Sequence, residues 1–259
     1  MNLPARDLAL LTEAAQAAGA IALRYWKNAP KAWDKADASP VTEADLACND
    51  VIMGILKRAR PGYGWLSEET PDDTARLECE HVFIVDPIDG TRAFIAGERH
   101  FSHSLAVARG GKITAAVVYL PALDKLYTAT HDGPALCDGA PIKCSQKSLA
   151  DAPNILTSKH SMDAENWQDT PPVFQRSFRA SLAYRLCLAA DGSFDGMITF
   201  QDAWEWDIAA GSLIAARAGA TVTDKHGRAL EFNAKSAQSA GTLACAPALH
   251  RDLMQLVKT

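Results

Sequence analysis

The chain has 259 residues, of which 48% are apolar and 22% charged, and its formal net charge is −5. A chain of this length can bury a sizeable core without disulfides or a structural metal. The acidic balance argues against nucleic acid and membrane surfaces as partners, because both attract basic proteins.

Six cysteines are scattered along the chain, and none forms a Cys-x-x-Cys pair or has a histidine at zinc-ligand spacing: Cys48, Cys79, Cys137, Cys144, Cys187 and Cys245. They predict free thiols in a reducing cytoplasm. Asp7 and Glu13 interrupt the first apolar residues, so we expect no secretory signal. No stretch approaches the roughly 18 apolar residues that cross a bilayer.

The first half combines two helices with a run of strands. Leu8 to Tyr25 follow a helical stripe with Asn2 as a cap, and a second helix should follow Ser39-Pro40 and end at Pro61-Gly62. A strand is predicted to stop at Asp86-Pro87, and a glycine turn should join the next two strands. The predicted strands cover residues 81–85, 101–107, 113–119, 126–130 and 135–137.

The second half alternates helices and strands. Helices are predicted at 181–190, at 207–218 with Gly219 as a left-handed cap, and from Pro247 onward. Strands are predicted at 197–200, 220–223 and 242–246. The expected fold class is therefore α+β, with helices layered on sheets in a single unit over residues 1–259 and a possible seam near 135–155.

The most informative segment is Asp86-Pro87-Ile88-Asp89-Gly90-Thr91, which follows an apolar strand. Pro87 stiffens the turn, so that both carboxylates can face one point. Carboxylates this close repel one another unless a cation lies between them, and magnesium takes such oxygen ligands together with a substrate phosphate. Gly90 permits close backbone approach, and the N–H groups of a helix start can bind phosphate.

Two other interpretations of this segment must be weighed. It could be a helix-capping turn with two solvated aspartates. The haloacid-dehalogenase phosphatases also run from a strand through acidic residues into Gly-Thr, but with Asp-x-Asp spacing and a phosphorylated aspartate. The Asp-x-x-Asp spacing of Asp86 and Asp89 favours metal ligation and direct attack by water.

Three further acidic sites could complete a cluster. Glu68-Glu69 lie at the end of an expected strand, although an adjacent pair is often solvated surface. Asp45 fits a capping box with Thr42, which does not exclude a second role. Asp207 lies at an expected helix start behind Trp206, where it could simply be the N-cap. The following Ala-Ala-Gly predicts close packing of that helix.

Together these segments resemble the inositol monophosphatase family of lithium-sensitive phosphatases, in the expected order and spacing. The segments that carry the resemblance are residues 35–45, 68–69, 86–91 and 206–211. The resemblance implies an α-β-α-β-α sandwich, a homodimer, a small phosphorylated metabolite as substrate, and two to three Mg²⁺ ions per site.

The resemblance also implies a role for each matching residue. Glu68, Asp86 and the carbonyl of Ile88 would hold one magnesium, while Asp86, Asp89 and Asp207 would hold a second. A third, loosely bound ion would lie near Glu68. The amides of Gly90 and Thr91 would bind phosphate. The catalytic residues would be Asp45, Glu68 and Thr91, with Asp45 and the Thr91 hydroxyl orienting the attacking water. Supporting or substrate-side positions would be Glu69, Arg92, Phe200 and Trp206.

The substrate stays open. Inositol-specific members of the family carry a glutamate six residues before the motif tryptophan, where this chain has Phe200. Residues 35–45, 117–123 and 181–187 look like the 3′(2′),5′-bisphosphate nucleotidase branch. Arg92-Ala93-Phe94-Ile95 instead resembles histidinol-phosphate phosphatases of the family. A non-catalytic regulatory role is a hypothesis of a different class, and no basic or disordered segment supports it. His100 and His103 are interpreted as strand or substrate-side residues.

Overall fold

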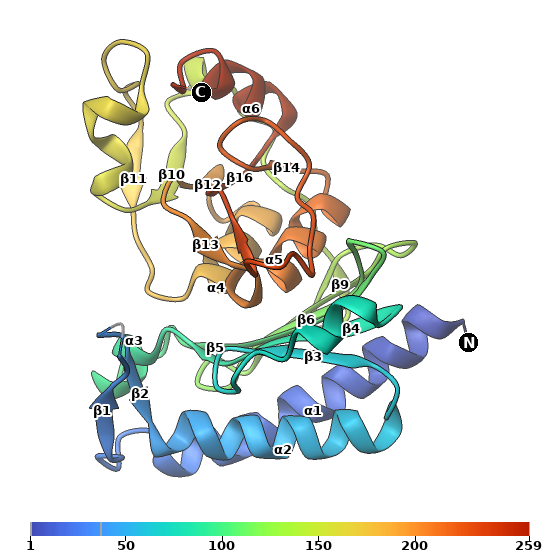
Figure 1. The fold of residues 1–259 in the computed structure, drawn as a ribbon. Coiled ribbons are helices and arrows are strands. Elements are labelled where there is room, and N and C mark those ends of the chain that lie inside the picture. Colours follow the sequence, from blue (N-terminus) through green and yellow to red (C-terminus); the bar gives the residue numbers. More distant parts are fainter. Residues whose placement is uncertain (1, 37, 259) are drawn as a thin grey trace.

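The computed structural model describes residues 2–36 and 38–258, so Asp37, within a segment that carries the resemblance, lies outside the described residues. Helices and sheets alternate in five layers (Figure 1). Two long helices cover one face of a seven-stranded sheet, two central helices lie between that sheet and a five-stranded one, and a last helix covers the outer face. The predicted α-β-α-β-α architecture is confirmed.

The outer helices are α1 (Leu3–Tyr25) and α2 (Glu43–Ala59). The predicted caps form as expected, because the Asn2 side chain accepts the N–H of Ala5 at 3.0 Å and Thr42 forms a capping box with Asp45. The apolar stripes of both helices pack on the seven-stranded sheet, with Leu11 and Ile52 fully buried. Capping and periodicity therefore account for this layer.

The seven-stranded sheet runs in the order β3-β4-β5-β6-β7-β8-β9, parallel between β3 and β4 and antiparallel elsewhere. Its strands are β3 (Gly64–Ser67), β4 (His81–Asp89), β5 (Ser102–Arg109), β6 (Lys112–Leu120), β7 (Lys125–Thr130), β8 (Leu136–Cys137) and β9 (Ala140–Pro141). Every predicted strand of the first half is present.

Strand β4 is longer than predicted, because it continues past Asp86 to Asp89. Its pairing with β5 shifts register between Asp86, opposite Ser104, and Asp89, opposite Ser102. Three residues along β4 therefore match two along β5, which defines a β-bulge. Pro87 explains the bulge, because it has no backbone N–H to donate to the neighbouring strand. Gly90 follows with φ +95°, and the short helix α3 (Thr91–Ile95) begins as expected.

The central layer consists of α4 (Leu182–Ala190) and α5 (Glu205–Arg217). A Cβ atom on Gly211 would lie 2.6 Å from Cβ of Leu186, so the predicted close packing of α5 is confirmed and is against α4. Helix α5 begins at Glu205, two residues before the predicted start, which puts Asp207 inside the first turn rather than at the N-cap. Gly219, with φ +97°, follows the end of α5 as predicted.

The five-stranded sheet runs in the order β11-β10-β12-β16-β14, and α6 (Pro247–Met254) packs on β16. Its strands are β10 (Asn154–Thr157), β11 (Gln175–Ser177), β12 (Gly196–Thr199), β14 (Thr221–Thr223) and β16 (Thr242–Cys245). Two short pairs complete the strands: β1 (Ala32–Asp34) with β2 (Pro40–Thr42), and β13 (Ala203–Trp204) with β15 (Gln238–Ser239). Among the helices that the structure describes, none is both long and apolar enough to cross a membrane.

Candidate active site

Three carboxylates meet where β4 ends and α5 begins. Asp86 and Asp89 flank the β4 bulge, Asp207 lies in the first turn of α5, and one carboxylate oxygen from each lies within 4.8 Å of the other two. Asp86 and Asp89 are buried and Asp207 is partly buried. Asp207 lies more than 110 positions from Asp86 and Asp89 in the sequence. The resemblance predicted that the three residues meet, and the structure brings them together.

The electrostatics of this cluster favour a bound cation. Burial raises the pKa of Asp86 well above its usual range, and the charges of Glu68, Asp89 and Asp207 raise it further. Burial likewise raises the pKa of Asp207, with Asp89 and Glu68 adding to the effect. A divalent cation between the carboxylates would remove this repulsion, because hard oxygen donors are the ligands of Mg²⁺ and Ca²⁺.

Hydrogen bonds to neighbouring elements hold the three aspartates in place. Ser104 on β5 is paired opposite Asp86 on β4. The Ser104 hydroxyl donates a hydrogen bond to the carbonyl of Trp206 at 2.8 Å, which connects the start of α5 to the sheet. Asp89 accepts the Ser181 hydroxyl at 2.7 Å and the N–H groups of Leu182 at 3.1 Å and Ala183 at 2.7 Å. Asp89 therefore also caps the N-terminus of α4, an interaction that stabilises its ionised form.

Glu68 and Glu69, which directly follow β3, both form an ion pair with Lys35. The Lys35 ammonium lies 2.9 Å from Glu68 Oε1 and 2.6 Å from Glu69 Oε1. Burial alone would lower the pKa of Lys35, but the two carboxylates raise it above its usual value. The burial of Glu69 raises its pKa to about 7, although Lys35 opposes this rise. Glu68 is thus close enough to act on Asp86 but stands outside the three-aspartate cluster.

Asp45 combines the two roles that its sequence position left open. Its Oδ2 accepts the backbone N–H of Thr42 at 2.8 Å, which completes the capping box of α2. Its Oδ1 lies 3.2 Å from the Thr91 hydroxyl, which is also 3.1 Å from the carbonyl of Ile88. Burial raises the pKa of Asp45 to about 6. The structure therefore joins Asp45, Thr91 and the Ile88 carbonyl in one polar group.

Arg92, Trp206 and Phe200, which were predicted to support the site or contact the substrate, differ in where the structure places them. Arg92 is exposed and lines a cavity beside α3. The ring of Trp206 stacks on Trp204, with centroids 4.7 Å apart. Phe200 requires a correction, because its ring is only 6% exposed and packs edge-on against Trp167 in the core under the five-stranded sheet. An apolar ring that ends a strand is buried there rather than in a pocket for the leaving group.

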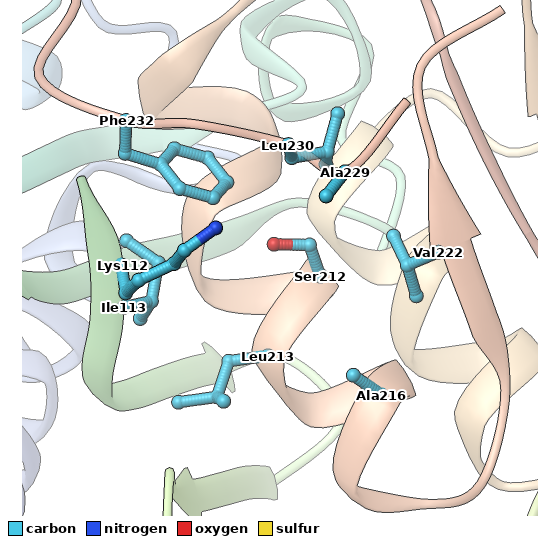
Figure 2. Close-up of a pocket in the computed structure, with 9 residues that line it drawn as sticks. All are labelled: Lys112, Ile113, Ser212, Leu213, Ala216, Val222, Ala229, Leu230 and Phe232. Carbon is cyan, nitrogen blue, oxygen red and sulfur yellow. The ribbon is translucent and has the colours of Figure 1, made fainter. Parts of the chain in front are cut away.

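A separate cavity of about 220 Å³ lies against the C-terminal half of α5 (Figure 2). Lys112 and Ser212 supply its polar side chains, and the other lining residues are apolar: Ile113, Leu213, Ala216, Val222, Ala229, Leu230 and Phe232. None of the described residues that line it is acidic. It therefore offers nothing comparable to the oxygen ligands of the aspartate cluster.

Sequence reasoning missed several residues that shape the site, namely Lys35, Ser104, Ser181 and the positioning role of His103. His103 on β5 is fully buried, and its Nδ1–H donates to the carbonyl of Pro87 in the bulge. Burial lowers the pKa of His103 to about 4, so the ring is neutral. The one available signal was the position of Ser181 at the start of the helix predicted over residues 181–190, where serine is typical of an N-cap.

Substitution of His103 should therefore weaken metal binding. His103→Leu removes the donor that holds Pro87 between Asp86 and Asp89, and second-layer partners of metal ligands are worth about 10- to 100-fold in affinity. We expect the magnesium concentration for half-maximal activity to rise at least about tenfold, and His103→Asn, which keeps a donor, to recover part of the loss.

His250 provides the matched control. It is also buried, and its Nε2 lies 2.8 Å from the Thr223 hydroxyl oxygen in the five-stranded sheet. His250→Leu should lower thermal stability without changing the magnesium dependence. An unchanged magnesium dependence in His103→Leu as well would show that His103 only fills space.

Comparison with known proteins agrees with this geometry. The model of the inositol monophosphatase family matches residues 5–259. The inositol-1-monophosphatase of Rhizobium meliloti is 36% identical over 203 residues, which cover 74% of this chain and 75% of the relative. The 3′(2′),5′-bisphosphate nucleotidase CysQ of Escherichia coli is 35% identical over 204 residues, covering 76% of this chain and 81% of the relative.

Solved structures share the fold over nearly the whole chain. The extragenic suppressor protein suhB from Bartonella henselae superposes with a TM-score of 0.85 and 27% identity, covering 96% of this chain and 97% of that one. An inositol monophosphatase from Zymomonas mobilis gives a TM-score of 0.81 at 24% identity, covering 98% of each chain. The chain therefore belongs to the inositol monophosphatase family, whose members are phosphoric monoester hydrolases, and is an enzyme of that class.

Proposed function

We propose that this enzyme hydrolyses a small phosphate monoester in a magnesium-dependent reaction in which water is the nucleophile. The observation that carries the proposal is the convergence of Asp86, Asp89 and Asp207 within 4.8 Å at the junction of β4 and α5. Their donor atoms are all carboxylate oxygens, which are the ligands that Mg²⁺ prefers. The three residues offer no sulfur or nitrogen ligand of the kind that transition metals prefer.

The proposed ligands are those that the resemblance implies, and the three-aspartate cluster supports one of the two sets. Asp86, Asp89 and Asp207 would hold one ion, and Asp86 would share a second with Glu68 and the carbonyl of Ile88. A third ion would bind loosely near Glu68, whose carboxylate is now paired with Lys35. Bound magnesium would lower the pKa of a coordinated water and neutralise charge on the phosphate.

The residues of the chain would supply orientation. The Thr91 hydroxyl donates to Asp45 Oδ1 at 3.2 Å, so both oxygens can accept hydrogen bonds from one water and fix its direction of attack. The backbone N–H groups of Gly90 and Thr91 are proposed to bind the phosphate oxygens. Phosphoryl transfer depends mainly on such positioning and charge neutralisation, which is consistent with a site that uses no nucleophilic cysteine or histidine.

The substrate is the part of the function that the relatives leave undecided. Their names include an inositol-1-monophosphatase and a bisphosphate nucleotidase at nearly equal identity. Phosphate release from inositol 1-phosphate, adenosine 3′,5′-bisphosphate and histidinol phosphate, measured with magnesium, tests the proposal. Release from at least one of them is expected, and a folded, magnesium-binding protein that releases phosphate from none would contradict it.

Three further properties are proposed on narrower grounds. Inhibition by lithium and assembly as a homodimer rest on membership of the family. A cytoplasmic location is supported by the six cysteines, all of which are free thiols.

A further inference from the structure

A cavity of about 360 Å³ lies beside Gly90, because a Cβ atom on Gly90 would be 3.2 Å from the carbonyl oxygen of His100, which lines the cavity. We name it the arginine pocket after its lining residues Arg92 and Arg179. It is continuous in sequence with the site on two sides. Arg92 follows Thr91 in α3, and Ala180 precedes Ser181, whose hydroxyl binds Asp89. A phosphate held at Gly90 and Thr91 would therefore lie next to this pocket, whose volume lies in the usual range for small-molecule sites.

The charge of the pocket is positive. The Arg92 side chain is exposed, and the Arg179 guanidinium donates to the carbonyl of Phe178 at 2.7 Å. Neither arginine has an ion-pair partner within the ranges that the structure describes. Glu98 is the one acidic lining residue in that part of the chain, and its side chain is exposed. The pocket thus has two guanidinium groups and one carboxylate.

A third arginine lies behind the pocket. Arg185 on α4 is only 9% exposed, and its guanidinium lies 4.9 Å from the centre of the Phe178 ring. Its Nε has no hydrogen-bond partner among the described residues. The charges of Asp89 and Asp207 act on Arg185 and partly offset the lowering of its pKa by burial. It therefore adds positive charge between the aspartate cluster and the pocket.

We propose, on the basis of the function proposed above, that the arginine pocket binds a second phosphate carried by the leaving group of the substrate. Guanidinium groups pair with phosphate through charge-assisted, often bidentate hydrogen bonds. A neutral polyol would leave both guanidinium groups without an anionic partner, and a cationic amine such as that of histidinol would be repelled. The charge of the pocket thus selects a bisphosphorylated substrate among the three candidates.

The same pocket offers an aromatic surface. The Phe178 side chain is 50% exposed, and His100, which also lines the pocket, stacks on Tyr184 with centroids 5.9 Å apart. Aromatic faces bind nucleobases by stacking regardless of sequence. The second phosphate could belong to a nucleotide or to an inositol bisphosphate. The test therefore compares one pair of substrates of each kind.

The test compares substrates that differ only in the second phosphate. We expect kcat/KM for adenosine 3′,5′-bisphosphate to exceed that for adenosine 3′-phosphate at least about tenfold, as one strong charged contact provides. Inositol 1,4-bisphosphate is compared with inositol 1-phosphate in the same way. In Arg92→Gln and Arg179→Gln the bisphosphate-to-monophosphate ratio should fall about tenfold, whereas Arg251→Gln, at an exposed position on α6, should leave it unchanged.

The outcomes separate this proposal from the function on which it rests. Hydrolysis of both members of each pair at equal kcat/KM, or arginine variants that lower both equally, would overturn the second-phosphate site while the phosphatase assignment stands. A preference confined to the nucleotide pair would identify the nucleotide as the source, and a preference in both pairs would identify the phosphate alone. If no substrate is hydrolysed, titration calorimetry with adenosine 3′,5′-bisphosphate decides, and an unchanged Kd in both arginine variants would overturn the site.

Discussion

Replacement of Asp207 by asparagine is expected to lower phosphate release at least about 100-fold while raising the melting temperature of the metal-free protein. The amide keeps the size of the side chain but removes a charge that magnesium needs, and losses of this order follow when a metal ligand or its close partner is removed. Without metal, the same change relieves repulsion with Asp86 and Asp89, whose oxygens lie within 4.8 Å. At pH 8 we expect a rise of at least about 2 °C, since about 1 kcal/mol shifts Tm by roughly 2–4 °C in a chain of this size.

The opposite signs of the two effects distinguish a metal ligand from a structural residue. Asp207 is not the N-cap of α5, so no capping bond is lost. Asp169→Asn, at an exposed position away from the site, is the control and should change neither activity nor Tm. A lower Tm of Asp207→Asn in chelator, or activity within a few-fold of wild type, would remove Asp207 from the ligand set.

Substitution of Gly90 by alanine should damage both stability and activity. The residue has φ +95°, which costs an alanine about 1–2 kcal/mol, and the new Cβ would lie 3.2 Å from the carbonyl oxygen of His100 and the backbone nitrogen of Ser181. Both neighbours are backbone atoms, so relief requires movement of the segments beside Asp89. We expect the free energy of unfolding to fall by about 2–5 kcal/mol, including a typical overpacking cost, and kcat/KM to fall at least about tenfold.

Gly110→Ala separates the conformational cost from the collision. Gly110 also has positive φ, at +53°, but a Cβ there meets no atom within 4 Å. Denaturant unfolding should show a loss of only about 1–2 kcal/mol, with phosphate release unchanged. If Gly90→Ala behaves like Gly110→Ala in both measurements, the close approach around Gly90 does not shape the site.

Local patterns predicted much of this molecule because they report local causes. The helical stripes of α1 and α2, the glycine turn after β5 and the αL residue after α5 depend on neighbours in sequence, and all are present. The spacing around Pro87 predicted that Asp86 and Asp89 face one point, whereas the resemblance predicted that Asp207 joins them. Asp207 taken alone was equally compatible with helix capping.

The features that sequence reasoning missed depend on contacts between distant segments. Lys35 meets Glu68 and Glu69 across more than 30 positions, and no local signal marks that pairing. The β4 strand was predicted to stop at Pro87, whereas pairing with Ser102 extends it to Asp89. Phe200 was assigned to the substrate side by its offset from Trp206, but the core contact with Trp167 determines where the ring lies.

Phosphate release by the metal-stripped enzyme, measured while magnesium is added back, tests the central claim most directly. The assay uses whichever substrate of the panel is hydrolysed fastest. If the aspartate cluster binds the magnesium that the reaction needs, the enzyme should be inactive in excess chelator, and its activity should rise to a plateau as magnesium is added. Metal-stripped Asp207→Asn should stay near the baseline over the same titration. Full activity of the wild-type protein in excess chelator would contradict a reaction that depends on magnesium at Asp86, Asp89 and Asp207.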